Sequence, residues 1–291
     1  MIDKPGGITS HDVVARVRRL AGVKRVGHTG TLDPMATGVL VLCLGRATRL
    51  IPYLEEDRGG SAKEYEAEIR FGFETTTDDA EGAPRAEVRS VTLEETALRA
   101  RLIDLSGEQD QVPPAFSAKK VAGERAYEIA RRGDAPDLHA VTVRIDAAEL
   151  LGFSDDRARI RLSCSRGTYV RSFARDLGRA LGFGAHLTAL RRTRTGRFVI
   201  GGALPLEGLT LEALSEALMP SAAVLSDWPS LSVDARHAGE IRQGKAIATQ
   251  ADRFPEPLRL RLLDQGGDLV ALATVRTGSV QPFCVFPLTA V

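Results

Sequence analysis

One carboxylate stands out among the residues of this chain that could do chemistry. Asp33 lies in the run Arg25–Leu40, where glycine, threonine and proline residues precede the apolar segment Val39–Cys43. Pro34 fixes its own φ angle and biases Asp33 away from the helical region. A lone Asp-Pro pair is usually part of an ordinary turn. A carboxylate held rigidly beside a strand end also suits a nucleophile or a general base.

The elements that must hold this turn follow from the spacing of apolar residues. A buried strand is predicted at 39–44 directly after the turn, and alternating apolar and charged residues predict a half-buried strand at 65–73. Thr9–Asp12 is typical of a helix start, with a threonine cap and an acid three residues on. Further helices are predicted at 93–105, 127–132 and about 169–181, and a further strand at 160–164. Strands and helices mix without a regular βαβ rhythm, which favours an α+β fold around a mostly antiparallel sheet.

Composition narrows the classes of protein that fit. The 291 residues can form one large domain and a small one, with 43% hydrophobic and 26% charged residues as in soluble globular proteins. No apolar run approaches the ~18 residues of a membrane span, and no signal peptide is expected. Cys43, Cys164 and Cys284 are isolated, which predicts buried thiols in a reducing cytoplasm. Neither CxxC nor HExxH occurs, so no metal site is expected.

The net charge of +1 conceals a strong local asymmetry. Residues 157–197 hold eleven arginines, no lysine and one acid, Asp176, which gives a net charge of +10 and leaves −9 for the rest of the chain. Such a field attracts phosphates, and arginine suits bidentate phosphate contacts. The plainer interpretation is the solvated face of a helix and two strands.

Two further segments are candidates for binding a polyanionic ligand. Residues 111–139 contain a long basic excursion, with Lys119, Lys120, Arg125, Arg131 and Arg132 against only two glutamates between 111 and 133. This segment is either an arm for a ligand or an ordinary surface helix with a loop. From about residue 227 short strand-like runs are split by glycine and proline, which predicts a small β domain at 227–291 after a larger domain at 1–226.

The sequence of the Asp33 motif resembles that of a known family. The run Arg25–Leu40 closely resembles the catalytic motif of the bacterial tRNA pseudouridine-55 synthases, the TruB family, which isomerise a uridine in the T arm of tRNA. Other blocks of the family follow in its order and spacing: Asp3–Ser10, Lys63–Tyr65, Gln111–Ala118, Cys164–Arg171 and Gly184–Arg192. So many ordered blocks make a chance match implausible.

The resemblance implies a fold and a reaction. It implies the pseudouridine synthase fold, with a mostly antiparallel mixed sheet flanked by helices and loops, and a PUA-like RNA-binding domain at 227–291. The reaction breaks the bond between ribose C1′ and uracil N1, rotates the base and rejoins it through C5, and needs neither cofactor nor metal. The partner is the T stem-loop of tRNA, whose uridine is extruded by base flipping. A cytoplasmic monomer that requires no protein partner is expected.

Three residues match the catalytic positions of the family. Asp33 is assigned as the nucleophile, with attack at uracil C6 or at ribose C1′ left open. Arg171 matches the arginine that orients this aspartate, and Tyr65 matches the tyrosine that stacks on the base and takes part in proton transfer. From residue type alone, Tyr65 would be a core residue.

Further residues are assigned to substrate binding by the same resemblance. His28 would fill the space that the flipped base leaves, and Leu190 would pack on the base from the side opposite Tyr65. Basic groups would contact phosphates without reading sequence. The remaining substrate-binding residues assigned are Lys4, Lys63, Asp79, Lys119 and Arg192.

The chain departs from the family pattern at several points. Only Met1-Ile2 precede Asp-Lys-Pro, so either the first strand is short or the true start of the protein lies upstream of Met1. Thr76 stands at a position where the family has an aspartate, and Arg175 stands at another. Compared with the family pattern, the run Phe116–Lys120 has phenylalanine in place of tyrosine and lysine in place of leucine, so it lacks one hydroxyl and carries one more positive charge. These departures bear on RNA contacts, because no catalytic group is lost.

Three alternative functions compete with this interpretation. An RNA-binding or tRNA-folding module could keep the fold without turnover, but it would not need Asp33 with its partner Arg171. A synthase working within a guide-RNA particle is disfavoured, because no lysine-rich extension is present. Hydrolysis by paired carboxylates is disfavoured as well, because the runs Asp78-Asp79 and Glu55–Asp57 are hydrophilic and predicted to be solvated turns.

Overall fold

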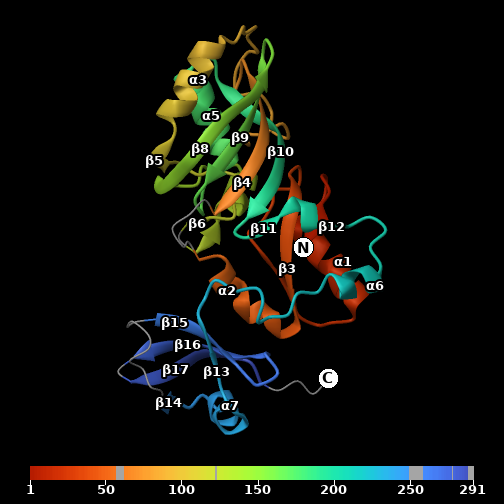
Figure 1. Ribbon diagram of the computed structural model, residues 1–291. Coiled ribbons are helices and arrows are strands. Elements are labelled where there is room, and N and C mark those ends of the chain that lie inside the picture. The colour runs from red at the N-terminus through yellow and green to blue at the C-terminus, as the bar shows by residue number, and fades with distance from the viewer. Residues whose placement is uncertain (57–61, 122, 249–257, 277, 288–291) are drawn as a thin grey trace. The chain divides into compact units, whose positions relative to one another are not determined.

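The computed structural model describes residues 1–56, 62–121, 123–248, 258–276 and 278–287. The chain divides into two compact units, each assembled from separate stretches of sequence (Figure 1). The first comprises residues 1–13, 30–41 and 55–208, and the second comprises 14–29, 42–54 and 209–291. The boundary at residues 226 and 227 stays a prediction, as does the PUA-like assignment. No helix within the described ranges has both the length and the apolar content to cross a membrane.

A mixed, mostly antiparallel sheet forms the frame of the first unit. Its strands run in the order β12-β1-β3-β10-β4-β9-β8-β5, and β11 pairs with β10. Neighbours are antiparallel except for β12 with β1 and β3 with β10. The strands are β1 (Ile2–Lys4), β3 (Thr37–Leu44), β4 (Lys63–Phe71), β5 (Gly107–Gln111), β8 (Val141–Phe153), β9 (Arg157–Cys164), β10 (Ala185–Thr195), β11 (Phe198–Val199) and β12 (Leu204–Pro205). The predicted α+β fold is confirmed.

Helices cover one face of this sheet. Side chains of α3 (Glu95–Asp104) and α5 (Val170–Ala180) share one buried cluster with the apolar positions of β4 and β9. Tyr65, Ala67, Ile69 and Phe71 lie in that cluster, as their alternation predicts. The remaining elements here are α1 (Ser10–Ala21), which continues into the second unit, α4 (Ala126–Arg131), the short helix η2 (Ile200–Gly202) and the paired β6 (Lys120–Val121) and β7 (Glu124–Arg125). The helices predicted at 93–105, 127–132 and 169–181 are confirmed to within two residues at each end.

The second unit is built on a separate five-stranded sheet. Its order is β13-β15-β16-β17-β14, with β13 parallel to β15 and the other pairs antiparallel. Leu50 lies in a buried cluster with Trp228, Leu272 and Phe286. The elements are β2 (Val26–Thr29), η1 (Gly45–Leu50), α2 (Ile51–Leu54), α6 (Leu211–Glu216), β13 (Ser230–Ser232), α7 (Ala235–Arg242), β14 (Ile247–Ala248), β15 (Leu258–Leu263), β16 (Leu269–Arg276) and β17 (Ser279–Val285). The β-rich character predicted for the C-terminal part is confirmed.

Gly38 lets two strands meet beside the Asp33 turn. Its φ of 105° lies in the left-handed region, and a Cβ there would stand 2.2 Å from the backbone oxygen of Arg192. We expect Gly38→Ala to lower the free energy of unfolding by more than ~2 kcal/mol. Urea denaturation measures this, with Gly201→Ala as control because a Cβ at Gly201 meets nothing within 4 Å. Equal losses in both variants would contradict the steric argument.

Candidate active site

The Asp33 turn is held from within by a buried lysine. The Nζ of Lys4 donates to the carbonyls of Pro5 (2.8 Å), Pro34 (3.1 Å) and Ala36 (2.7 Å). The side chain is fully buried, and burial lowers the pKa of Lys4 to about 8 although Asp33 acts in the opposite direction. Lys4 therefore fixes the backbone directly after Asp33 and ties it to Pro5, with its three donors committed to the protein.

Arg171 forms a two-pronged ion pair with Asp33. Its Nε lies 2.9 Å from Oδ2 of Asp33, and an Nη donates to Oδ1 at 3.2 Å. The other contacts fix the guanidinium: Asp79 Oδ2 at 3.3 Å, the carbonyl of Thr77 at 3.0 Å and the carbonyl of Phe116 at 3.0 Å. The Arg171 side chain is 5% exposed and that of Asp33 is 35% exposed. The arrangement presents an oriented carboxylate to solvent in front of a buried cation.

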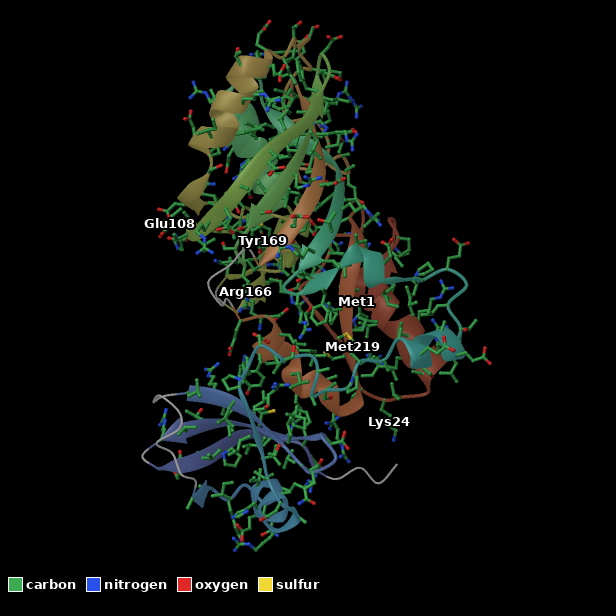
Figure 2. The ribbon with its side chains drawn as sticks, viewed as in Figure 1. Met1, Lys24, Glu108, Arg166, Tyr169 and Met219 are labelled. Atoms are coloured by element: carbon green, nitrogen blue, oxygen red, sulfur yellow. The ribbon has the colours of Figure 1, made fainter. Side chains whose placement is uncertain are left out.

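These groups come together at one end of the sheet of the first unit. Arg171 stands in the first turn of α5, which follows β9 through the loop that contains Arg166 and Tyr169 (Figure 2). The backbone N–H of Tyr169 donates to the side-chain oxygen of Gln111 at 2.8 Å, which joins this loop to the end of β5. The start of α5 is thereby fixed to the segment that begins the basic excursion.

Asp78 and Asp79 are not solvated, and that prediction is wrong. They are 5% and 3% exposed. Asp79 accepts hydrogen bonds from the Thr77 hydroxyl and the Glu81 N–H and pairs with Arg171. Asp78 pairs with Arg175 at 2.9 Å. The countercharges lie more than ninety residues away on α5, so local hydrophilicity did not reveal the burial.

Tyr65 and Leu190 lie in the same buried cluster as Leu32, the residue before Asp33. They are 5% and 7% exposed, on β4 and β10 respectively. Burial raises the pKa of Tyr65 to about 12, although Arg192 acts in the opposite direction. Burial and the Arg192 charge lower the pKa of Lys63, two residues earlier, to about 8. At neutral pH the Tyr65 phenol is therefore protonated.

The raised pKa of Tyr65 predicts a loss of stability at high pH and a late titration of the phenol, which absorbance can follow. An unfolded tyrosine loses its proton near pH 10, and Tyr65 holds its proton to about pH 12. Between these values the unfolded state binds fewer protons, so the stability that Tyr65 contributes falls as pH rises from about 10 to about 12. The phenolate absorbance of wild type minus Tyr65→Phe should show one group with a midpoint near 12. A midpoint near 10 would contradict the burial argument.

The remaining residues assigned to substrate binding differ in their burial and in the unit to which they belong. Arg192 is fully buried and donates to the carbonyls of Val39 and Gly30, each at 2.9 Å. Lys63 and Lys119 are half-buried. His28 is half-buried in β2 and belongs to the second unit. The structure thus groups Asp33, Arg171, Asp79, Tyr65, Leu190, Lys4, Lys63 and Arg192 in the first unit together with Lys119.

The arginine-rich segment is less of an open positive field than its charge of +10 indicates. At least six of its eleven arginines form ion pairs within the described residues: Arg157, Arg161, Arg171, Arg175, Arg179 and Arg191. The acids come from outside the segment in most cases, for example Glu66 and Glu68 of β4 opposite β9. The negative remainder of the chain therefore neutralises part of the block, and much of the segment is an ion-paired face.

Two residues in the setting of this site were not predicted from the sequence. Arg175 and its partner Asp78 are both buried directly beside the Arg171 contacts. The sequence feature that could have revealed them is Arg175 itself, because the family pattern has an aspartate at this position. An arginine in that position needs a countercharge, and Asp78 and the neighbouring Asp176 each pair with it at 2.9 Å.

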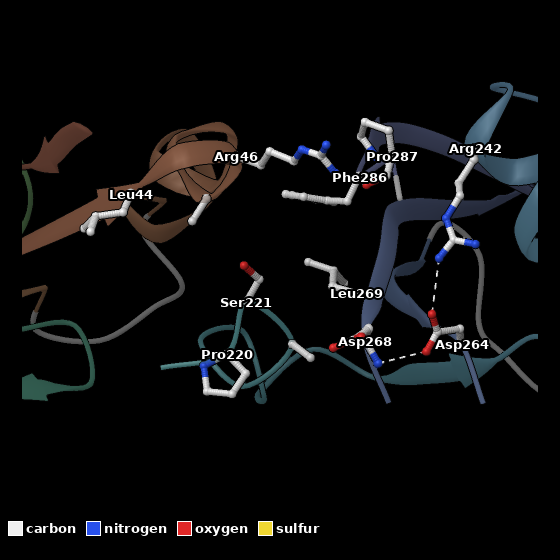
Figure 3. Close-up of a pocket in the computed structure, with 12 residues that line it drawn as sticks. Leu44, Arg46, Pro220, Ser221, Arg242, Asp264, Asp268, Leu269, Phe286 and Pro287 are labelled. Atoms are coloured by element: carbon white, nitrogen blue, oxygen red, sulfur yellow. Dashed lines mark hydrogen bonds and ion pairs between the residues drawn. The ribbon is translucent and has the colours of Figure 1, made fainter. Parts of the chain in front are cut away.

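A separate cavity of about 360 Å³ lies within the second unit (Figure 3). The described residues that line it include none of the predicted site residues. Two of its charged side chains pair, since Arg242 meets Asp264 at 3.2 Å, and the backbone N–H of Asp268 also donates to Asp264 at 3.0 Å. The constellation around Asp33 is therefore the candidate active site.

Family models match most of the chain. Residues 18–170 match the N-terminal domain of the TruB family of pseudouridylate synthases, and residues 171–226 match the C-terminal domain of tRNA pseudouridylate synthase B. Together they contain Asp33, Tyr65, Arg171 and Leu190.

Relatives and solved structures agree with this match. The chain is 46% identical to tRNA pseudouridine synthase B of Thermobifida fusca, over 98% of this chain and 97% of the relative. It is 45% identical to the same enzyme of Solibacter usitatus, over 94% of each. A chain of a Cbf5-Nop10-Gar1 complex superposes with a TM-score of 0.71 at 24% identity, over 98% of this chain and 84% of that one. A chain of an H/ACA RNP bound to a substrate RNA gives 0.70 at 23% identity, over 98% and 83%, which supports the fold. The chain therefore belongs to the TruB family of pseudouridylate synthases.

Proposed function

We propose that this protein, an isomerase by its family, converts uridine 55 in the T loop of tRNA into pseudouridine. The observation that carries the proposal is the two-pronged ion pair between Asp33 and Arg171. It leaves the carboxylate one-third exposed and its partner almost fully buried. The names of the two bacterial relatives supply the substrate, tRNA.

The proposed reaction begins at the Asp33 carboxylate. The ion pair with Arg171 engages both carboxylate oxygens and fixes the direction of the carboxylate. Attack at uracil C6 or at ribose C1′ gives a covalent intermediate. The C1′–N1 bond breaks, the base rotates and a C1′–C5 bond forms as Asp33 departs, after which C5 loses its proton and the freed N1 gains one. Atoms and charge balance without an added cofactor.

Tyr65 and Leu190 are proposed to enclose the base. Their burial in one cluster next to Leu32 supports a dry apolar pocket behind the carboxylate. The raised pKa of Tyr65 keeps the phenol protonated at neutral pH. Tyr65 then acts as a stacking surface and as a donor in proton transfer, consistent with its sequence assignment.

The buried cations receive different proposed roles from the half-buried ones. Lys4 and Arg192 have donors committed to backbone carbonyls around the turn, so we assign them to positioning Asp33. Lys63 and Lys119 keep the proposed role of phosphate contacts. Asp79 is assigned to holding Arg171, which it meets at 3.3 Å.

Access to the uridine requires base flipping, which costs a few kcal/mol. His28 is proposed to fill the vacated space, residues 111–139 to fold onto the RNA, and residues 227–291 to add a PUA-like RNA-binding domain. We propose that the protein acts in the cytoplasm as a monomer without a protein partner.

Tritium release tests the reaction. A T-arm transcript labelled at uracil C5 is incubated with the protein in the presence of a chelator, and a transcript with cytidine at position 55 serves as control. Release from the first and not from the second is expected. Tight binding without release would identify an RNA-folding module, and release that persists with the control transcript would move the modified position.

A further inference from the structure

Helix α5 carries arginines at three positions four residues apart, and all three reach the 74–82 turn. Arg171 meets Asp79 at 3.3 Å, Arg175 meets Asp78 at 2.9 Å and Arg179 meets Glu74 at 2.6 Å. Residues four apart lie on one face of a helix. The first of these arginines also pairs with Asp33, whereas the third is exposed, with the Arg179 side chain at 57%. The second, buried pair has no part in the proposed reaction.

The Arg175–Asp78 pair is more constrained than an ordinary surface ion pair. The side chains are 9% and 6% exposed. Asp78 has a φ of 61° and is the sole non-glycine residue with positive φ in the described part of the chain. Burial raises the pKa of the Asp78 carboxyl even with Arg175 beside it. A buried ion pair contributes little net stability, so stability alone does not account for it.

Arg171 and Arg175 bridge the same two segments. Arg171 donates to the carbonyls of Thr77 and Phe116. Arg175 binds Asp78 on the turn and donates to the carbonyl of Val112 at 2.9 Å, where the Ser172 hydroxyl also donates at 2.8 Å. Arg175 therefore holds the same two backbone stretches as Arg171, one helical turn further along α5. These stretches supply Arg171 with two carbonyls and the Asp79 carboxylate.

We propose that Asp78 and Arg175 form a positioning pair that sets the approach of Arg171 to Asp33. The proposal rests on the proposed function, since it assumes that Asp33 is the nucleophile. Without the pair, the turn with Asp79 and the segment with Phe116 lose a shared anchor, and Arg171 gains freedom to leave its two-pronged geometry. Arg175 departs from the family pattern, and the charge of Asp78 matches that departure.

Paired substitutions test this coupling. Asp78→Asn removes the charge and suits the left-handed backbone, because asparagine tolerates positive φ. Arg175→Gln removes the partner, and Arg175→Lys keeps the charge without the planar fork. Arg179→Gln is the matched control on the same helix face. For each variant, kcat and KM for tritium release and the thermal midpoint are measured, together with Asp33→Asn.

We expect Asp78→Asn and Arg175→Gln each to lower kcat about 10-fold, with KM within about twofold. The double variant should lose no more than either single one, because the two residues act as one unit. Arg175→Lys should fall between Arg175→Gln and wild type, and it keeps the test open if Arg175→Gln does not fold. Arg179→Gln should stay within about twofold.

Several outcomes would overturn the pair's role. Unchanged kcat with a lowered thermal midpoint would make the pair purely structural. A double variant whose loss equals the product of the single losses would show that the residues act independently. If wild type is active and Asp33→Asn is inactive, either of these results refutes the positioning role of the pair and leaves the proposed function standing. An inactive wild type would refute the proposed function, and the positioning role would fall with it.

Discussion

Replacing Asp33 by asparagine should abolish tritium release, with kcat reduced by at least about 10⁴-fold. The amide has nearly the shape of the carboxylate and can still accept a hydrogen bond from Arg171, but it has no anionic oxygen with which to attack. Affinity for the T-arm transcript should stay within about threefold, because no phosphate contact is removed. Single-turnover release and filter binding measure the two quantities separately.

Asp3→Asn provides the matched control for this loss. Asp3 also forms a two-pronged ion pair with an arginine, Arg191, at 2.7 and 3.1 Å, and its side chain is 31% exposed. That variant should keep kcat within about twofold, since a partly exposed ion pair outside the Asp33 turn contributes little. If Asp33→Asn retained more than about a hundredth of wild-type kcat, Asp33 would be a positioning group and another nucleophile would have to be sought.

The local parts of the fold follow from sequence because their causes are local. Alternation along β4 places Tyr65 and Ile69 in the core, and Thr9 with Asp12 marks the start of α1. Here the period of apolar residues and the chemistry of the cap determine the outcome. The motif around Asp33 likewise identifies the candidate nucleophile without reference to any distant residue.

The parts that could not be predicted depend on partners far apart in the chain. Asp78 and Asp79 form a hydrophilic pair locally, and only the arginines of α5 make their burial possible. Lys4 was assigned to phosphate, whereas the Asp33 turn folds over it and takes its three donors. The division into units has the same cause, since residues 14–29 and 42–54 join the C-terminal stretch. Charge counted along the sequence cannot show which charges neutralise one another in space.

Replacing Arg171 by lysine should lower kcat about 10³-fold, which corresponds to ~4 kcal/mol. The guanidinium serves Asp33, Asp79 and two carbonyls at once through a rigid planar fork. An ammonium keeps the charge, but it cannot hold both oxygens of Asp33 and the other acceptors together. Since the charge survives, the loss measures orientation of the nucleophile.

The Arg191→Lys variant separates orientation in this site from a general effect of arginine loss. Arg191 pairs with Asp3 in the same two-pronged manner, but its side chain is 41% exposed. We expect less than about a threefold change in kcat there. Asp79→Asn should fall between the two arginine variants, because it removes one of the contacts that fix Arg171 and leaves the pair with Asp33. A kcat for Arg171→Lys within about tenfold of wild type would show that charge alone suffices, and that the directed geometry of the Asp33 carboxylate does not limit the reaction.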